Sequence, residues 1–191
     1  GHYWRQVMMG ADSVWYWMWS AIGAWQGFQQ PDLDAPGPVR EMLADTQIVR
    51  DGLGDLLLQY EMQHDGIAVL YSYPDLTAES EPRNKTYRSL WAAIATWDQI
   101  IHDLNMQYNF VTERMLLSGE FATGNYKVLV LPRTLCIGEK AAAVIRRFVD
   151  NGGTVIADVR PAFYNERCKP YDKPILDDLF GVSGGCAEAV P

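Results

Sequence analysis

Carboxylates are the first candidates for chemistry in this sequence, because two of them held close together can act as general acid and base. Four lie where loops or strand ends are expected, namely Asp75, Glu79, Glu113 and Asp158. No spacing pairs any two of them, and exposed acidic side chains are expected in a chain of net charge −8. We expect Asp158 to cap or bond a neighbouring loop. The sequence therefore predicts no catalytic residue within this chain.

Cys136 is the thiol to test as a nucleophile. It lies in Thr134-Leu-Cys136-Ile-Gly138, which is faintly similar to the Gly-x-Cys-x-Gly elbow of class I glutamine amidotransferases. Thr134 stands where that elbow has its first glycine. The histidine base of that family follows the cysteine, whereas the last histidine here is His102. Without a base no activated thiolate forms, so we expect Cys136 to be a small buried residue.

The thiols and imidazoles show no ligand spacing. They are Cys136, Cys168, Cys186, His2, His64 and His102. With three cysteines at least one thiol stays unpaired, which favours a reducing compartment such as the cytoplasm. No glycine lies between Gly66 and Gly119, so a glycine-rich phosphate loop for a nucleotide or flavin is not expected. We predict no metal and no cofactor.

The composition and net charge of the chain exclude several classes of binding partner. A chain of 191 residues that is 48% hydrophobic and 21% charged can bury a core. Its net charge of −8 argues against nucleic acids and anionic membrane surfaces as partners. No apolar run reaches the roughly 18 residues that span a bilayer. The opening residues GHYWRQ lack the basic and apolar regions of a signal peptide.

Beyond residue 65, short apolar runs alternate with helical patterns. Strands are expected at 67–71, 107–111, 127–131 and 154–157. Helices are expected at 84–104, at 113–121, before the stop at 151–153, and as a last turn at 175–180. This alternation predicts an α/β fold, with an open parallel sheet and helices on both faces. Ligands of such sheets lie at the carboxyl ends of the strands.

A separate helix is expected before the sheet. The turn-rich PDLDAPGPV precedes it, and Pro38 suits the first turn of a helix. Apolar residues at helical spacing then predict an amphipathic helix over 38–60. Gly52 and Gly54 weaken its second half, by about 1 kcal/mol each relative to alanine.

Aromatic residues crowd the start of the chain, where five of the seven tryptophans fall within 25 residues. The alternating run 13–20 predicts a strand with Trp15, Trp17 and Trp19 on one face. Three indoles on one face need a large partner surface. Either the later domain supplies it, or this segment belongs to a larger body, which is the interpretation we favour.

The order of these pieces resembles the C-terminal part of a β-galactosidase of glycoside hydrolase family 42, from about Trp4 to Val182. The matching stretches are 4–19, 48–54, 67–72, 126–132, 148–155 and 179–182. The most specific are Tyr126-Lys-Val-Leu-Val-Leu-Pro132 and Phe148-Val-Asp-Asn-Gly-Gly-Thr-Val155. The resemblance implies the end of a (β/α)8 barrel at 1–35, a connecting helix at 36–64, and a trimerisation domain at 65–191. That domain is expected to be class I glutamine amidotransferase-like, or flavodoxin-like.

The resemblance also implies a function. The parent enzyme would be a retaining glycosidase with both catalytic glutamates before residue 1, and the first glutamate here is Glu41. This chain would be its non-catalytic assembly domain, forming a homotrimer and meeting carbohydrate only through the barrel. Trp17 and Trp19 would wall the sugar pocket. Residues 20–30 lack the Glu and His that hold sugar hydroxyls in the family, which leaves another glycoside open as the substrate.

A function of a different class is the alternative. The chain could be a free-standing amidotransferase-like module that binds a small molecule or a protein, with its aromatic N-terminus as part of its own core. An assembly domain is expected to self-associate through apolar patches. A free-standing module is expected to be a compact, two-state monomer.

Overall fold

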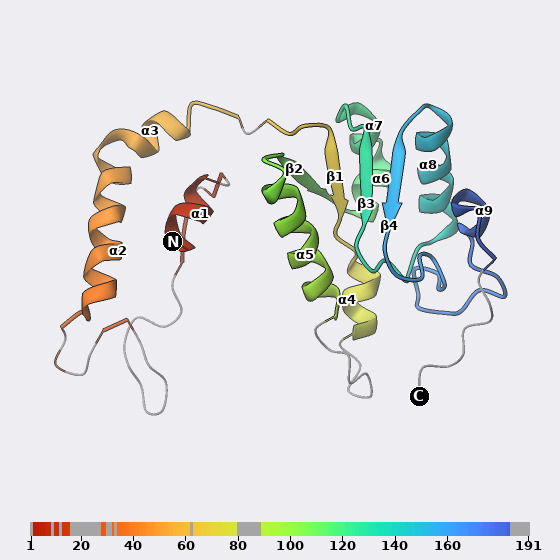
Figure 1. The fold of residues 1–191 in the computed structure, drawn as a ribbon, viewed down its shortest axis with the longest axis horizontal. Helices are drawn as coiled ribbons and strands as arrows, with labels where there is room; N and C mark the ends of the chain where they lie inside the picture. The colour runs from red at the N-terminus through yellow and green to blue at the C-terminus, as the bar shows by residue number, and fades with distance from the viewer. Residues whose placement is uncertain are drawn as a thin grey trace. The chain divides into compact units, whose positions relative to one another are not determined.

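The computed structural model describes residues 2–8, 10–11, 13–15, 28–29, 32, 34–61, 63–79 and 89–183 (Figure 1). The chain falls into two compact units, Gly1–Met62 and Gln63–Pro191. The first unit holds short helices, and the second holds a parallel sheet with its helices (Figure 1).

The N-terminal unit contains the helices α1 (His2–Met8), α2 (Gly37–Ile48) and α3 (Gly54–Leu57). Pro38 lies in the first turn of α2, as predicted. The single helix predicted over 38–60 is wrong in its second half. Gly52 has a φ of 139° inside a π-helical turn at Val49–Leu53, and α3 ends at Leu57. Glycine adopts such a φ without steric cost, so the chain bends there.

The strand predicted over 13–20 is not present in its described part. Ser13, Val14 and Trp15 have no regular secondary structure, and the Trp15 side chain is 90% exposed. The Trp15 indole donates to the Ser13 hydroxyl at 3.2 Å. Trp17 and Trp19 lie outside the described residues.

The second unit is built on a four-stranded sheet in the order β2-β1-β3-β4. The strands are β1 (Ile67–Leu70), β2 (Tyr108–Val111), β3 (Val128–Leu131) and β4 (Thr154–Ala157). All three pairings are parallel. The prediction of a parallel α/β sheet is confirmed. All four strands lie within one residue of their predicted bounds, because each is a short run of mainly apolar residues.

Six helices are described in this unit: α4 (Tyr73–Glu79), α5 (Ser89–Asp103), α6 (Glu113–Ser118), α7 (Glu120–Thr123), α8 (Glu139–Asp150) and α9 (Asp177–Phe180). The helix predicted over 113–121 is divided, because Gly119 has a φ of 93°. α8 ends just before Asn151, as predicted. The stretch 72–81 was expected as a loop, but Tyr73–Glu79 forms α4.

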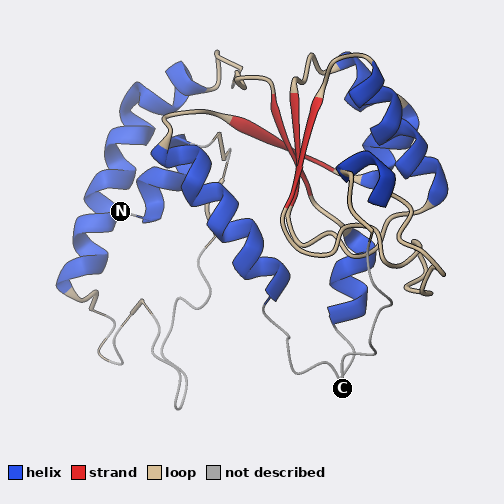
Figure 2. Cartoon of the chain, turned by 45° about the vertical axis from the view of Figure 1, so that its right-hand side comes forward, coloured by secondary structure: helices blue, strands red, loops and turns tan. Residues whose placement is uncertain are grey.

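Alternate residues of β1 face two different cores. Ala68 and Leu70 pack with residues of α6, α7 and α8, whereas Ile67 and Val69 pack with α5. Figure 2 shows these helices on opposite sides of the sheet. β1 is therefore buried on both faces, as its continuous apolar sequence predicts. The outer strands β2 and β4 keep exposed residues.

Candidate functional site

The carboxyl ends of β1 and β3 hold the polar residues that could do chemistry. Ser72 and Asp75 follow β1, and both are buried. The Ser72 hydroxyl accepts a hydrogen bond from the Asp75 backbone N–H at 3.3 Å, which caps the start of α4. Pro74 occupies the first turn, where its missing N–H costs nothing. The serine and proline are the sequence signals that could have identified this helix.

Asp75 is buried rather than exposed on a loop, with 1% of its surface accessible. Its carboxylate accepts hydrogen bonds from the backbone N–H groups of Leu135, at 3.0 Å, and Cys136, at 3.1 Å. Burial raises the pKa of Asp75 to about 6, although these bonds and the one from Ser72 lower it. The carboxylate therefore joins the turn after β1 to the loop after β3.

Cys136 is buried, as predicted, with 1% of its surface exposed. Burial raises the pKa of its thiol, and the nearby Asp75 carboxylate raises it further. Its sulfur lies 3.7 Å from the sulfur of Cys168. A thiol kept protonated by its surroundings is not an activated nucleophile. The structure therefore confirms that Cys136 is a small buried residue.

Glu113 lies in the first turn of α6, and burial raises the pKa of its carboxyl. Hydrogen bonds from Ser72 and from the backbone of Tyr73 oppose this shift. The structure thus brings Glu113 and Asp75 to the same serine, which their spacing in the sequence did not indicate. Glu113 lines a cavity of about 460 Å³, and Asp75 is not among the lining residues. Within the described residues, the two acids do not face a common cavity as an acid–base pair would.

Asp158 bonds a neighbouring loop, as predicted. Its Oδ1 accepts from the backbone N–H groups of Arg133 and Val159, and its Oδ2 accepts from the Trp97 indole at 3.1 Å. Asp158 therefore holds the loops after β3 and β4 to α5. Glu79 ends α4, and its side chain lies outside what the structure describes.

The histidines take structural roles where their side chains are described. The His64 ring stacks on Tyr126 with centroids 4.6 Å apart. His102 Nδ1 lies 2.7 Å from the Asp98 carbonyl oxygen in α5. Within the described residues, no group of three or more His, Cys, Asp or Glu side chains is placed to hold a metal ion. Nor does any helix there combine the length and apolar character needed to cross a bilayer.

An exposed aromatic cluster lies beside the edge strand β2, and we call it the aromatic edge. It consists of Tyr71, Tyr73, Trp91 and Phe110. The Tyr71 ring contacts the other three, with centroids 5.6–5.9 Å apart. Tyr73 is 61% exposed, Trp91 53% and Phe110 42%. Clustered exposed apolar side chains mark interaction surfaces. This cluster was not predicted, because the sequence pattern does not show that β2 lies at an edge of the sheet.

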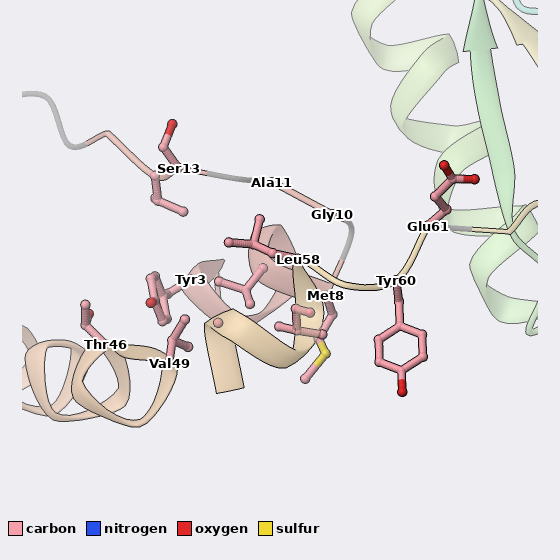
Figure 3. Close-up of a pocket in the computed structure, with 14 residues that line it drawn as sticks. Tyr3, Met8, Gly10, Ala11, Ser13, Thr46, Val49, Leu58, Tyr60 and Glu61 are labelled. Carbon is pink, nitrogen blue, oxygen red and sulfur yellow. The ribbon is translucent and has the colours of Figure 1, made fainter. Parts of the chain in front are cut away.

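The N-terminal unit contains a cavity of its own, of about 570 Å³ (Figure 3). Its lining comes from α1, from α2 and α3, and from the segments beside them. Most of the side chains are apolar, such as Val7, Val49 and Leu57, and Glu61 is the one charged residue among them. Figure 3 shows Tyr3, Met8 and Leu58 around this space. A mainly apolar lining with one charge is suited to packing rather than to catalysis.

Comparisons with known proteins place the second unit in a family. Residues 65–190 match the family model described as the β-galactosidase trimerisation domain. No curated protein sequence is significantly similar to the chain.

Three solved structures illustrate the fold likeness. A β-galactosidase from Bifidobacterium adolescentis is 19% identical with a TM-score of 0.55, covering 64% of this chain and 57% of that one. A catalytic mutant of Gan42B, a GH42 β-galactosidase from G. stearothermophilus, is 18% identical with a TM-score of 0.66, covering 88% of this chain and 25% of that one. The β-galactosidase from the psychrophilic Marinomonas ef1 is 18% identical with a TM-score of 0.58, covering 93% and 28%. The chain thus spans 57% of the first structure and about a quarter of the other two.

Proposed function

The chain belongs to the β-galactosidase trimerisation domain family, and from this membership we propose that it assembles the subunits of a glycoside hydrolase into a homotrimer. The family match over residues 65–190 is the observation that carries the proposal. The carboxyl-end residues are in keeping with a non-catalytic role. The Asp75 carboxylate bonds to two backbone N–H groups, and the Cys136 thiol contacts the Cys168 thiol.

The proposed division of the chain has three parts. Residues 1–35 form the end of a catalytic (β/α)8 barrel, 36–64 a connecting segment, and 65–191 the trimerisation domain. The boundary between compact units at Met62 and Gln63 supports the second division. The match to Gan42B covers 88% of this chain, which is more than residues 65–190 supply, so it includes part of the N-terminal unit. Both catalytic glutamates belong to the barrel portion before residue 1.

The finer fold class is also a proposal. We infer that residues 65–191 have the class I glutamine amidotransferase-like, flavodoxin-like arrangement, with the catalytic elbow lost. The parallel order β2-β1-β3-β4 supports it, as does the position of Cys136 in the loop after β3. Thr134 replaces the first glycine of the elbow, and it is fully buried.

The aromatic edge is the surface through which the copies associate. Three of its four rings are between 42% and 61% exposed, and burying a large apolar side chain contributes about 1.5–3 kcal/mol. Tyr71 holds these rings together from the carboxyl end of β1. Among the described strands β2 lies at the edge of the sheet, and the outer backbone groups of an edge strand can pair with another chain.

The substrate proposal rests on the barrel portion. The whole protein hydrolyses a β-galactoside or a related glycoside, and Trp17 and Trp19 form an apolar wall beside the sugar ring. Both tryptophans lie outside the described residues. Residues 20–30 contain no Glu or His, and for this reason the proposed substrates include glycosides other than galactosides.

Sedimentation equilibrium of the purified chain over a range of concentrations tests the assembly. We expect a species of three times the monomer mass. Trp91→Glu should dissociate it, because it places a charge in the aromatic edge. The matched control is Leu117→Glu on α6, which is equally exposed at 53% and outside the aromatic edge. A monomer at all concentrations would contradict the proposed assembly function. A trimer that survives Trp91→Glu would contradict the assignment of the aromatic edge as the contact surface.

A further inference from the structure

We propose that Cys136 and Cys168 form a reversible disulfide, which makes them an oxidative modification site in this domain. Their sulfur atoms lie 3.7 Å apart, whereas a disulfide bond is about 2 Å long. Both residues are free thiols in this structure. The inference is independent of the proposed assembly function, since neither cysteine belongs to the aromatic edge.

The backbone around each cysteine holds the two sulfur atoms near one another. Segment 135–137 is bonded to Tyr164, whose backbone N–H donates to the Leu135 carbonyl at 2.9 Å, while Ile137 donates back to Tyr164 at 2.8 Å. Cys168 closes a tight turn by donating to the Asn165 carbonyl at 2.9 Å. These two bonded segments place side by side two thiols that lie 32 residues apart in the sequence.

The two thiols differ in access to solvent, which sets the order of reaction. Cys136 is 1% exposed, so an oxidant cannot reach its sulfur directly. Cys168 is only partly buried, and its thiol is 3.5 Å from the Pro74 carbonyl oxygen. Cys168 is therefore the residue that meets an oxidant first, and Cys136 is the resolving thiol behind it.

The oxidant is a small disulfide such as oxidised glutathione, and the exchange takes two steps. In the first, the Cys168 sulfur attacks the small disulfide, forms a mixed disulfide and releases one small thiol. In the second, the Cys136 sulfur attacks the Cys168 sulfur, and the bond from Cys168 to the small thiol breaks. Two cysteine thiols are thereby oxidised and one small disulfide is reduced to two thiols.

Asp75 supplies a proton acceptor for the second step. The Asp75 carboxylate already accepts from the Cys136 backbone N–H at 3.1 Å, so an acceptor for the thiol proton lies beside the attacking residue. The leaving small thiolate takes up a proton from solvent. Burial keeps the Cys136 thiol protonated until then, which protects it from other electrophiles.

Intact-mass spectrometry of the full chain incubated with oxidised glutathione tests whether Cys136 and Cys168 form a disulfide. Cys186→Ser is the background, because it leaves only the two cysteines in question. We expect a product lighter by two hydrogen atoms, with no retained glutathione, that dithiothreitol returns to the starting mass. Adding Cys168→Ser should leave the chain unmodified. Adding Cys136→Ala should leave one glutathione bound at Cys168.

Two results would overturn the proposal. One is a glutathione adduct that persists on the Cys186→Ser chain, because it would show that Cys136 does not resolve it. The other is a chain that stays reduced when folded but is oxidised under the same conditions in denaturant. The wild-type chain provides a check without substitutions. Digestion before aspartate separates Cys168 from Cys186 at Asp172 and Asp177, so a link to Cys186 would also count against the pair.

Discussion

The backbone N–H of Cys136 donates to both carboxylate oxygens of Asp75, at 3.1 and 3.3 Å. The two residues are 61 positions apart in the sequence, and the neighbouring Leu135 N–H donates to the same carboxylate. These bonds fasten the first turn of α4 to the loop after β3. Asp75 therefore acts as an anchor for the carboxyl end of the sheet, and its ionisation is coupled to the stability of the domain.

The first prediction concerns pH. The pKa of Asp75 is raised from 3.8 to about 6 in the folded chain, so the folded state binds this proton more tightly than the unfolded state. The resulting stabilisation is complete below about pH 4 and is lost as the pH rises through 6. We expect it to be about 3 kcal/mol. Denaturant unfolding of the wild type between pH 4 and 7.5 should show this fall.

Comparison with Asp75→Asn isolates the pH-dependent stabilisation that comes from protonation of Asp75. Its side-chain oxygen can still accept from the Leu135 and Cys136 N–H groups, but it cannot ionise. The difference in unfolding free energy between wild type and variant should therefore change with pH between 4 and 6. The pKa of Glu113 is also raised, and this group is present in both proteins. Parallel curves for the two proteins would contradict the assignment.

A second prediction tests the Asp158 bonds. Asp158→Ala removes the acceptor for the backbone N–H groups of Arg133 and Val159 and for the Trp97 indole. We expect a loss of about 1–2 kcal/mol in urea unfolding. Trp97→Phe should show how much of this loss belongs to the indole bond. Asp172→Ala, at another exposed aspartate, serves as control and should be close to wild type.

A third prediction concerns the close approach of Gly153 and Phe148. A Cβ atom at position 153 would lie 2.4 Å from the Phe148 ring. That ring packs against Phe121 with centroids 5.0 Å apart, so it cannot move freely. Gly153→Ala should cost about 1–3 kcal/mol through overpacking. In a Phe148→Leu background the cost should shrink, and equal costs in both backgrounds in thermal unfolding would exclude this contact as the cause.

A fourth prediction follows from the cysteine pair. Linking residues 32 positions apart reduces the entropy of the unfolded chain, and the chain-entropy model gives up to about 4 kcal/mol. The oxidised chain should therefore melt at a higher temperature than the reduced chain. Cys168→Ser should melt at one temperature under both conditions. If oxidation leaves the wild-type Tm unchanged or lowers it, the bond strains the native loops.

The local features of this fold were predictable from the sequence. The four strands lie within one residue of the predicted bounds, because each is a short run with at most one polar residue. The end of α8 before Asn151 follows from the glycines that come after it. The family resemblance was also available from the order of short stretches, and the match over residues 65–190 confirms it.

The features that sequence reasoning missed have two origins. Some were local signals left unused, since Ser72 with Pro74 marks the start of α4 and Gly52 bends the predicted long helix. Others depend on which strands are neighbours. The aromatic edge exists because no strand among the described residues pairs with the outer side of β2, and no local pattern specifies a position within a sheet.

Sequence by itself determined the strands of the sheet, the α/β class and the family, because apolar patterning and short motifs act between residues close in the chain. Only the tertiary structure decided which side chains meet. It brought Asp75 to the Cys136 backbone and the Cys168 sulfur to within 3.7 Å of the Cys136 sulfur. Those contacts arise when the crossover connections of a parallel sheet bring the ends of distant strands to one edge. The spacing of residues along the chain does not predict which strand ends meet.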